Sequence, residues 1–310
     1  MIVGLTFGCV LIVTSSFVDI PYLFIFLFGF ALGTLGSFLN FTSIWICQRK
    51  VSDKNISFVT GFGLAGVALS PYIFSLIFAG IVNPQNDNPN VEVEKNGVKF
   101  NIYNEKTAQH VKVGLCVLGV VIAVLGLIGI LCFYEKNSQV NARKVSYTIG
   151  FKDLLKKGMF WLILMINYLK MFSFLFVINI YKAVGVEYIK NSTVLLYVSG
   201  VGFIIGAISR VMFGKLLDKI SWVKLNLIET SLEGILYILY AFSLNYPAFV
   251  MTITILLIGF TSMAHLTMWI LTEKLFPQDK WVFSIISLTN PISLLTVYLL
   301  TLFTIPVKTK

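Results

Sequence analysis

The stretch Thr193–Lys224 reads TVLLYVSGVGFIIGAISRVMFGKLLDKISWVK, and it decides the class of fold. Its first part is an apolar run as long as the roughly 20 residues that a helix needs to cross a bilayer. Small residues recur along this run, and in lipid they allow a neighbouring helix to approach closely. The run also carries Arg210, and an arginine costs about 2.5 kcal/mol or more in hydrocarbon. We therefore expect Arg210 to face other protein segments or a water-filled cavity.

The composition of the whole chain agrees with a membrane location. Hydrophobic residues make up 57% of its 310 residues, only 12% are charged, and the mean hydropathy is +0.87. A soluble domain has about 25% charged residues. Apolar runs long enough to span a bilayer lie near residues 2–18, 22–46, 57–82, 111–133, 159–181, 193–213, 223–244, 248–272 and 282–304. The sequence therefore predicts an all-α polytopic membrane protein with about nine transmembrane helices.

The net charge of +10 originates in the loops. Most lysines and arginines lie in the loops after the second, fourth, sixth and eighth runs, on one side of the predicted membrane. Because positively charged loops face the cytoplasm, we expect the chain to start there at Met1. The basic charge thus orients the spans in a lipid bilayer and does not indicate a nucleic-acid partner.

A long basic segment divides the chain into two helical halves. We predict an N-terminal bundle over residues 1–133, with a polar loop at 83–110, and a C-terminal bundle over residues 159–304. Residues 134–158 form the cytoplasmic linker between the bundles in this prediction. A short tail follows at 305–310.

Metal and catalytic chemistry find little support in the sequence. The chain has two histidines and four cysteines, with no C-x-x-C pair, and such a set does not suit a metal site or a disulfide framework. We also find no nucleophile in a pattern with a base. We therefore expect no enzyme activity, no metal and no cofactor.

The loop after the sixth run carries a recognisable pattern. Arg210 lies four residues before Gly214, and Asp218 and Lys219 follow at the spacing of G-R-x-x-x-G-x-x-x-D-R/K-x-G-R. This segment resembles the loop between spans eight and nine of the major facilitator superfamily. The resemblance implies that Gly214, Asp218 and Lys219 belong to a motif that controls the cytoplasmic gate. Three positions depart from the pattern, namely Ser209, Ser221 and Trp222.

A second segment resembles one branch of that superfamily. The third run carries glycines and a proline behind a basic stretch, and this arrangement is similar to span five of the monocarboxylate transporter and oxalate/formate antiporter branch. On this register the nine runs correspond to family spans three to eleven, so the resemblance implies that spans one, two and twelve are missing. We expect these glycines and prolines to serve helix packing and bending. The residues concerned are Gln48–Lys50, Gly61, Gly63, Gly66 and Pro71, with Pro291 in the ninth run.

Ionisable side chains lie at one depth of the predicted membrane. Counted from the cytoplasmic ends of their helices, Arg210, Glu233 and His265 lie about 12–14 Å deep. Lys170 lies about 20 Å deep, and Asn40 holds the equivalent place in the first half. A polar layer near the middle of the bilayer, between two helical halves, is where transporters bind substrate. The predicted substrate-binding residues are Arg210, Lys170, His265 and Asn40.

Each of these charged residues also has a structural interpretation, and the sequence leaves the choice open. Arg210 either binds an anion, as the matching arginine does in related carboxylate transporters, or forms an ion pair with Glu229 or Glu233. The two glutamates share a helix face and either balance the charge of Arg210 or couple transport to a proton. Lys170 is either a second cation for the substrate or an ion-pair partner. His265 is either a hydrogen-bonded interior residue or a proton relay.

The leading hypothesis is a secondary active transporter of a small organic anion that works by alternating access. The oxalate-type antiporters carry a lysine in span eleven, and residues 282–304 contain none, which favours a monocarboxylate-like substrate. A proton is the candidate coupling ion. A rival hypothesis from another class is a truncated or degenerate paralogue that does not transport and acts as a membrane receptor or scaffold.

Overall fold

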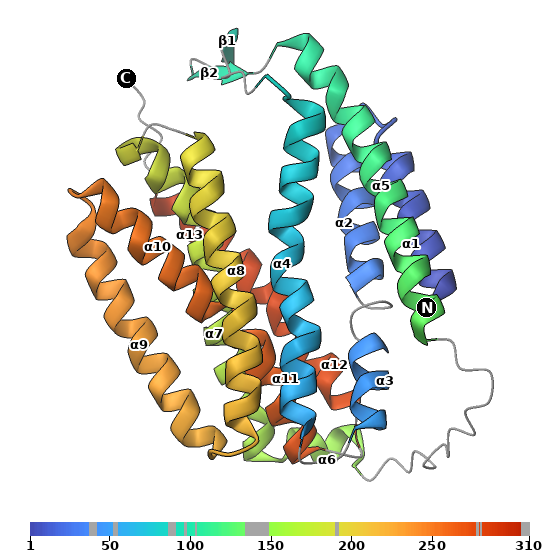
Figure 1. Cartoon of the computed structure of the whole chain (residues 1–310), viewed down its shortest axis with the longest axis vertical. Coiled ribbons are helices and arrows are strands. Elements are labelled where there is room, and N and C mark those ends of the chain that lie inside the picture. Colours follow the sequence, from blue (N-terminus) through green and yellow to red (C-terminus); the bar gives the residue numbers. More distant parts are fainter. Residues whose placement is uncertain are drawn as a thin grey trace. The chain divides into compact units, whose positions relative to one another are not determined.

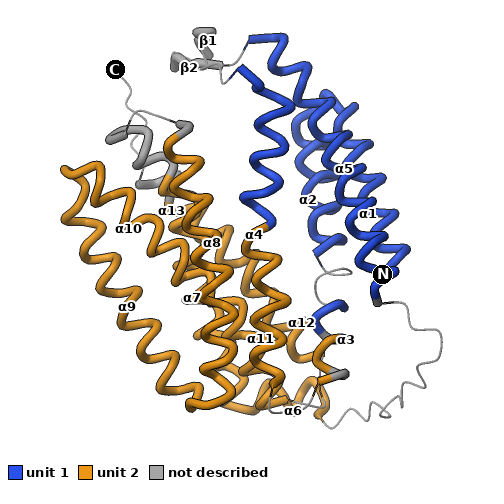
Figure 2. The backbone as a smooth tube through the Cα atoms, in the orientation of Figure 1, with its two compact units in different colours: residues 1–46, 70–140, 309–310 blue, residues 47–69, 141–308 orange. Residues whose placement is uncertain are grey.

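The structure is a computed structural model of the whole chain (Figure 1). It describes residues 1–36, 42–51, 55–85, 91–95, 98–102, 104–133, 149–189, 192–276, 279 and 281–304. The described chain is helical apart from one two-stranded hairpin. It divides into two compact units, one formed by residues 1–46, 70–140 and 309–310 and the other by residues 47–69 and 141–308 (Figure 2).

The first unit is built on three apolar helices and the second half of a fourth. They are α1 (Ile2–Ser15), α2 (Pro21–Leu35), α5 (Glu105–Phe133) and the part of α4 (Ile56–Val82) from Ser70 onward. α3 (Thr42–Lys50) spans the boundary between the units. The core of this unit lies between α1 and α2, where Leu5, Ile12 and Ala31 are almost fully buried.

α1 runs antiparallel to α5. Gly126 of α5 lies against Leu5, and Gly119 lies against Val13. Further along, Lys112 forms an ion pair with Asp19 at 2.9 Å. The absence of a side chain at the two glycines allows α1 to approach closely, which is the packing that small residues favour in lipid.

A β-hairpin lies in the polar segment that the sequence analysis places at 83–110. Its strands are β1 (Val91–Lys95) and β2 (Val98–Ile102), which pair antiparallel with Val91 opposite Ile102 and Lys95 opposite Val98. The hydrophobicity pattern does not predict this hairpin. Alternating residues such as Val-Glu-Val-Glu are nevertheless typical of a strand with one polar face.

The second unit contains the remaining helices and the first half of α4. α8 packs against α10, and α7 packs against α13. Gly202 and Gly206 of α8 lie close to Ile258 and Ser262, so small residues again permit the close approach. The helices are α6 (Phe151–Leu155), α7 (Gly158–Ile189), α8 (Ser192–Leu217), α9 (Trp222–Ser243), α10 (Pro247–Thr261), α11 (Ala264–Leu275), α12 (Trp281–Ser287) and α13 (Thr289–Thr304).

Seven segments among the described residues are long and apolar enough to cross a membrane. They are Ile56–Val82, Glu105–Cys132, Gly158–Tyr181, Val194–Leu217, Trp222–Ser243, Pro247–Leu275 and Trp281–Leu300. The chain is therefore an α-helical multi-pass membrane protein. α1 and α2 are equally apolar but have only 14 and 15 residues, which corresponds to about 21–23 Å. The run predicted at 22–46 contains α2 and the start of α3, with residues 37–41 outside the described residues, and the count of nine spans stays a prediction.

Two of the spans are interrupted in the middle, where the sequence pattern predicts continuous helices. The first break lies at Ser262 and Met263, between α10 and α11, and the second lies at Leu288, between α12 and α13. The hydroxyl of Ser262 donates a hydrogen bond to the Gly259 carbonyl and so competes with the helical pattern. Pro291 follows the second break and has no N–H for a helical hydrogen bond.

The first half of α4 belongs to the second unit, whereas the sequence-based division groups it with residues 1–133. Two features explain the difference. The carboxylate of Asp218 accepts hydrogen bonds from the backbone N–H groups of Ser57 and Phe58. In addition, Gly61 lies directly against the carbonyl of Arg210. A hydropathy pattern identifies a span but not the neighbour against which it packs.

Candidate functional site

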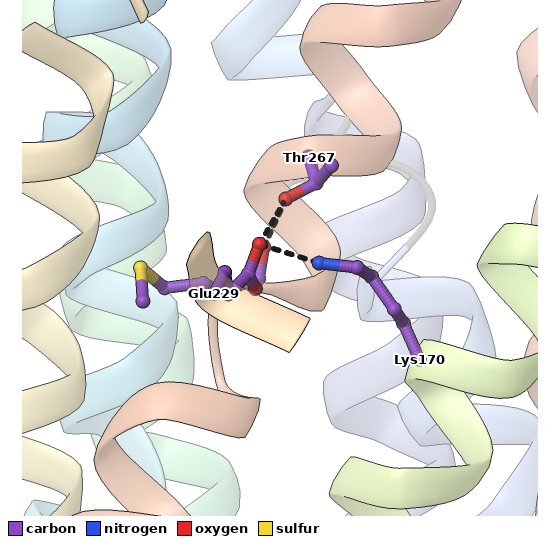
Figure 3. A network of polar contacts seen from close by, with 4 residues as sticks. Lys170, Glu229 and Thr267 are labelled. Atoms are coloured by element: carbon purple, nitrogen blue, oxygen red, sulfur yellow. Dashed lines mark hydrogen bonds and ion pairs between the residues drawn. The ribbon is translucent and has the colours of Figure 1, made fainter. Parts of the chain in front are cut away.

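A buried ion pair joins α7 to α9. The ammonium group of Lys170 contacts Oε2 of Glu229, and the two side chains are only 8% and 3% exposed. The hydroxyl of Thr267, on α11, donates to the same carboxylate oxygen at 3.5 Å. Figure 3 shows Lys170 and Thr267 approaching Glu229 from two other helices. Three spans thus meet at one carboxylate.

A second carboxylate belongs to this cluster. Glu233 lies one turn further along α9, is buried, and interacts electrostatically with both Glu229 and Lys170. With all three groups ionised, the cluster carries one net negative charge, and an uncompensated buried charge is costly. Uptake of one proton makes the cluster neutral, which is the property that a proton-coupling site needs.

Arg210 is the largest of the fully buried side chains among the described residues, at 1% exposure. Its Nη1 donates to the carbonyl of Leu64 at 2.5 Å, and its Nε donates to the carbonyl of Ser262 at 2.9 Å. Within the described ranges, no carboxylate lies at ion-pair distance from its guanidinium group. The ion pair with Glu229 or Glu233, left open by the sequence, is therefore absent, and Glu229 pairs with Lys170 instead.

The break between α10 and α11 explains why Arg210 bonds to the carbonyl of Ser262. The carbonyl of Ser262 lies at this break, where the regular helical ladder is interrupted. An unsatisfied carbonyl within the membrane costs several kcal/mol, of the order of a lost hydrogen bond in an apolar medium. The guanidinium group of Arg210 supplies the missing donor and holds α8 against both α10 and α4.

Asn167, which the sequence analysis missed, also donates a hydrogen bond to a carbonyl beside a helix break, the one at Leu288. The amide of Asn167, on α7, donates to the carbonyl of Ile286 at 3.3 Å and also contacts the hydroxyl of Thr289. Asn167 is buried at 3% exposure. An asparagine within an apolar span, together with Pro291 in another span, is the signal that could have identified this contact.

His265 lies on α11, just beyond the first break. Its ring packs edge-to-face on Phe174, with the ring centroids 5.8 Å apart, and it interacts electrostatically with Arg210. The buried Nδ1 atom has no hydrogen-bond partner among the described residues. His265 thus lies near the guanidinium group but is not part of the Lys170–Glu229 cluster.

The predicted gating motif contacts the beginning of α4. Oδ1 of Asp218 accepts from Ser57 N at 3.2 Å, and Oδ2 accepts from Phe58 N at 3.1 Å. Asp218 therefore caps the N-terminus of α4, where a negative charge is also favoured by the helix dipole. Gly214 lies against the carbonyl of Ser57, and a Cβ atom there would come within 2.5 Å of that oxygen. Lys219 is exposed.

The remaining predicted residues are Asn40 and the helix-packing set. Asn40 lies outside the described residues. Gly61 lies against the backbone of Arg210, whereas a side chain at Gly66 would meet open space. Three further packing residues are exposed, namely Gly63, Pro71 and Pro291.

Comparisons with known proteins do not assign the chain to a family. No known family model matches the chain, and no well-characterised protein is similar enough to be matched.

Proposed function

We propose that this protein is a secondary active transporter of a small organic anion, and that it works by alternating access. The observation that carries the proposal is that the buried charge of Arg210 has no carboxylate partner among the described residues. Arg210 is a fully buried cation that donates hydrogen bonds to two neutral backbone carbonyls. A substrate anion would supply the missing negative charge.

The chemistry of the guanidinium group suits a carboxylate. It has five N–H donors, and the two bonds to Leu64 and Ser262 leave further donors for a substrate. A planar fork of N–H groups matches the two oxygens of a carboxylate. This geometry supports a monocarboxylate-like substrate.

The interrupted spans support the same proposal. Discontinuous helices are typical of transporter substrate sites, because backbone groups freed at a break can serve a ligand or a neighbouring side chain. Arg210 bonds at one such break and Asn167 bonds at the other. Both breaks lie in the unit that contains the Lys170–Glu229 cluster.

The cluster is the proposed coupling site. Lys170, Glu229 and Glu233 become neutral when they bind one proton, so anion and proton would move together. This assigns the two glutamates to coupling and Lys170 to their control. We further propose that the fold is of the major facilitator type, as the pattern around Arg210, Gly214 and Asp218 implies.

The test is uptake of radiolabelled lactate, pyruvate and acetate by liposomes that contain the purified full chain, with an inward proton gradient. We expect R210A to lose uptake by about thirty-fold or more, since removing a buried charge partner costs about 2–5 kcal/mol. R210K keeps the charge but not the fork and should recover only part of the activity. The matched control is K224A, which removes an exposed positive charge from the same unit.

Two outcomes would contradict the proposal. Full uptake by R210A would remove Arg210 from the substrate site. No uptake of any of these anions by the wild-type chain, with folded protein in the liposomes, would favour the receptor or scaffold hypothesis.

A further inference from the structure

A small cavity lies beside the Lys170–Glu229 pair. It is lined by residues of α8, α9 and α11, among them Trp222, Asn226, Glu229 and Thr267. The cavity offers about 10 Å³ to the centre of a water molecule, which is about what one water needs. It is separate from the contacts of Arg210, because neither Leu64 nor Ser262 lines it.

Three polar atoms at this cavity have no hydrogen-bond partner among the described residues. They are Nε1 of Trp222, Oδ1 of Asn226 and Oε1 of Glu229, and all three atoms are buried. The residues follow one another along α9 at a spacing that places them on one helix face. Glu229 is itself only 2% exposed. A buried polar atom without a partner is costly, so a ligand at this place is favoured.

The chemistry of the three atoms fits water. Trp222 offers an N–H donor, whereas Asn226 and Glu229 offer oxygen acceptors. A water molecule accepts from the first and donates to the other two, and buried waters make about three hydrogen bonds of this kind. A metal cation fits less well, because an indole N–H is only a donor and cannot act as a ligand to a cation.

We propose that this cavity binds a water molecule that carries protons between the Trp222 end of α9 and the carboxylate of Glu229. The proposal rests on the proposed function and names the proton as its coupling ion. Trp222 is the first residue of α9, so the route begins at the end of the helix. It reaches Oε1, the oxygen of Glu229 that Lys170 and Thr267 do not use.

The cavity water relays the proton and stays neutral. It gives one of its own protons to Oε1 of Glu229 while it accepts another from a hydronium ion at the Trp222 end of α9. One O–H bond of the water breaks and one forms, an O–H bond forms at Oε1, and the hydronium ion becomes water. Lys170 stays an ammonium ion, but its partner is then a neutral carboxyl group. The weakened pair frees Lys170 to interact with Glu233 or with a substrate anion.

The groups around Glu229 limit what else could respond to pH. Lys170 faces it from α7, and Glu233 lies beside it on α9. α8 and α11 contribute no ionisable side chain to the cavity. The residues at the cavity outside α9 are Phe213 and Leu217 of α8, Met263 at the break, and Leu266 and Thr267 of α11.

Infrared spectroscopy of the full chain in lipid tests the proposal without a substrate. The carboxylic-acid C=O band of Glu229 is assigned as the band that grows on acidification and is lost in E229Q. After exchange into D₂O, the shift of this band gives the rate at which its proton exchanges. We expect W222F and N226L each to slow this exchange about ten-fold, since each removes one hydrogen bond of the water.

Matched controls are available in the same unit. W161F makes the same change at a tryptophan whose Nε1 donates to the Leu155 carbonyl, outside the cavity. N179L makes the same change at an asparagine that bonds one turn back to Leu175. Both controls should exchange at the wild-type rate.

Wild-type exchange in the double variant W222F/N226L would overturn the proposal, and so would the lack of any band that depends on Glu229. Neither result depends on transport. A chain that exchanges as expected but takes up no anion would retain the water site and lose the proposed function.

Discussion

At the scale of single residues, the described part of the second unit holds two buried cations in different environments. Lys170 has a carboxylate partner, whereas Arg210 has two carbonyl partners. The burial of Arg210 could be expected from its place in an apolar span, because an arginine is costly in hydrocarbon. The partners of the two cations could not, because the sequence of one helix does not tell which neighbouring helix faces it.

The Lys170–Glu229 pair gives a prediction about stability. K170M leaves Glu229 as a buried charge without its partner, and we expect it to lower the free energy of unfolding by about 3–5 kcal/mol. The double variant K170M/E229L removes both charges and should recover most of this loss, because an apolar pair of similar volume is often neutral or better. Thermal unfolding of the purified chain, followed by tryptophan fluorescence, measures both.

Stability losses of K170M and E229L that simply add in the double variant would contradict this prediction. If the double variant were less stable than K170M by the full cost of E229L alone, the two side chains would not interact as a pair.

The role of the cavity residues Trp222 and Asn226 could not be predicted from the sequence, for the same reason that the partner of Lys170 could not. Their role depends on α8 and α11, which the sequence of α9 does not reveal.

At the scale of elements, the contact between α8 and the first half of α4 depends on two glycines. Gly61 lies against the Arg210 carbonyl and Gly214 lies against the Ser57 carbonyl. At both glycines the backbone of one helix lies directly against the backbone of the other, which leaves no room for a side chain. The resemblance to span five drew attention to Gly61, and the structure adds the helix that it contacts.

We predict opposite effects for two glycine variants of α4. G61A places a methyl group against a backbone carbonyl and should destabilise the protein by about 1–3 kcal/mol. G66A meets open space and should be neutral or stabilising by up to about 1 kcal/mol, because alanine favours the helix. Melting temperatures of the two variants in the same detergent decide the matter, and equal values would show that α4 and α8 are not in close contact.

At the scale of the whole molecule, hydropathy predicted the multi-pass helical class and the approximate bounds of seven spans. It did not predict the breaks at Ser262 and Leu288, because a side chain on another helix stabilises each one. Packing between helices, which the sequence encodes only indirectly, accounts for these differences.

The contacts between α1 and α5 predict the path of the N-terminal segment. Because α1 lies along α5 from Gly126 to Lys112, we expect Asp19 and Lys112 to lie on the same side of the membrane. In a chain whose four cysteines are replaced by serine, D19C and K112C should react with a membrane-impermeant maleimide from one side only. K215C should react from the other side, as the basic loops predict.

Labelling of D19C from the side of K215C would contradict this path. It would mean that α1 does not accompany α5 across the bilayer. Labelling of D19C and K112C from one side would support α1 as a further span, despite its short helix.

The break between α10 and α11 has a consequence for the order of events in a transport cycle. Ser262, on one side of the break, is held by Arg210, and Thr267, little more than a turn further on, touches Glu229. A small bend at this joint would therefore disturb both contacts in a single movement. Occupancy at the arginine would then change the affinity for a proton at the glutamate, and the proton would change the affinity for the anion by the same factor.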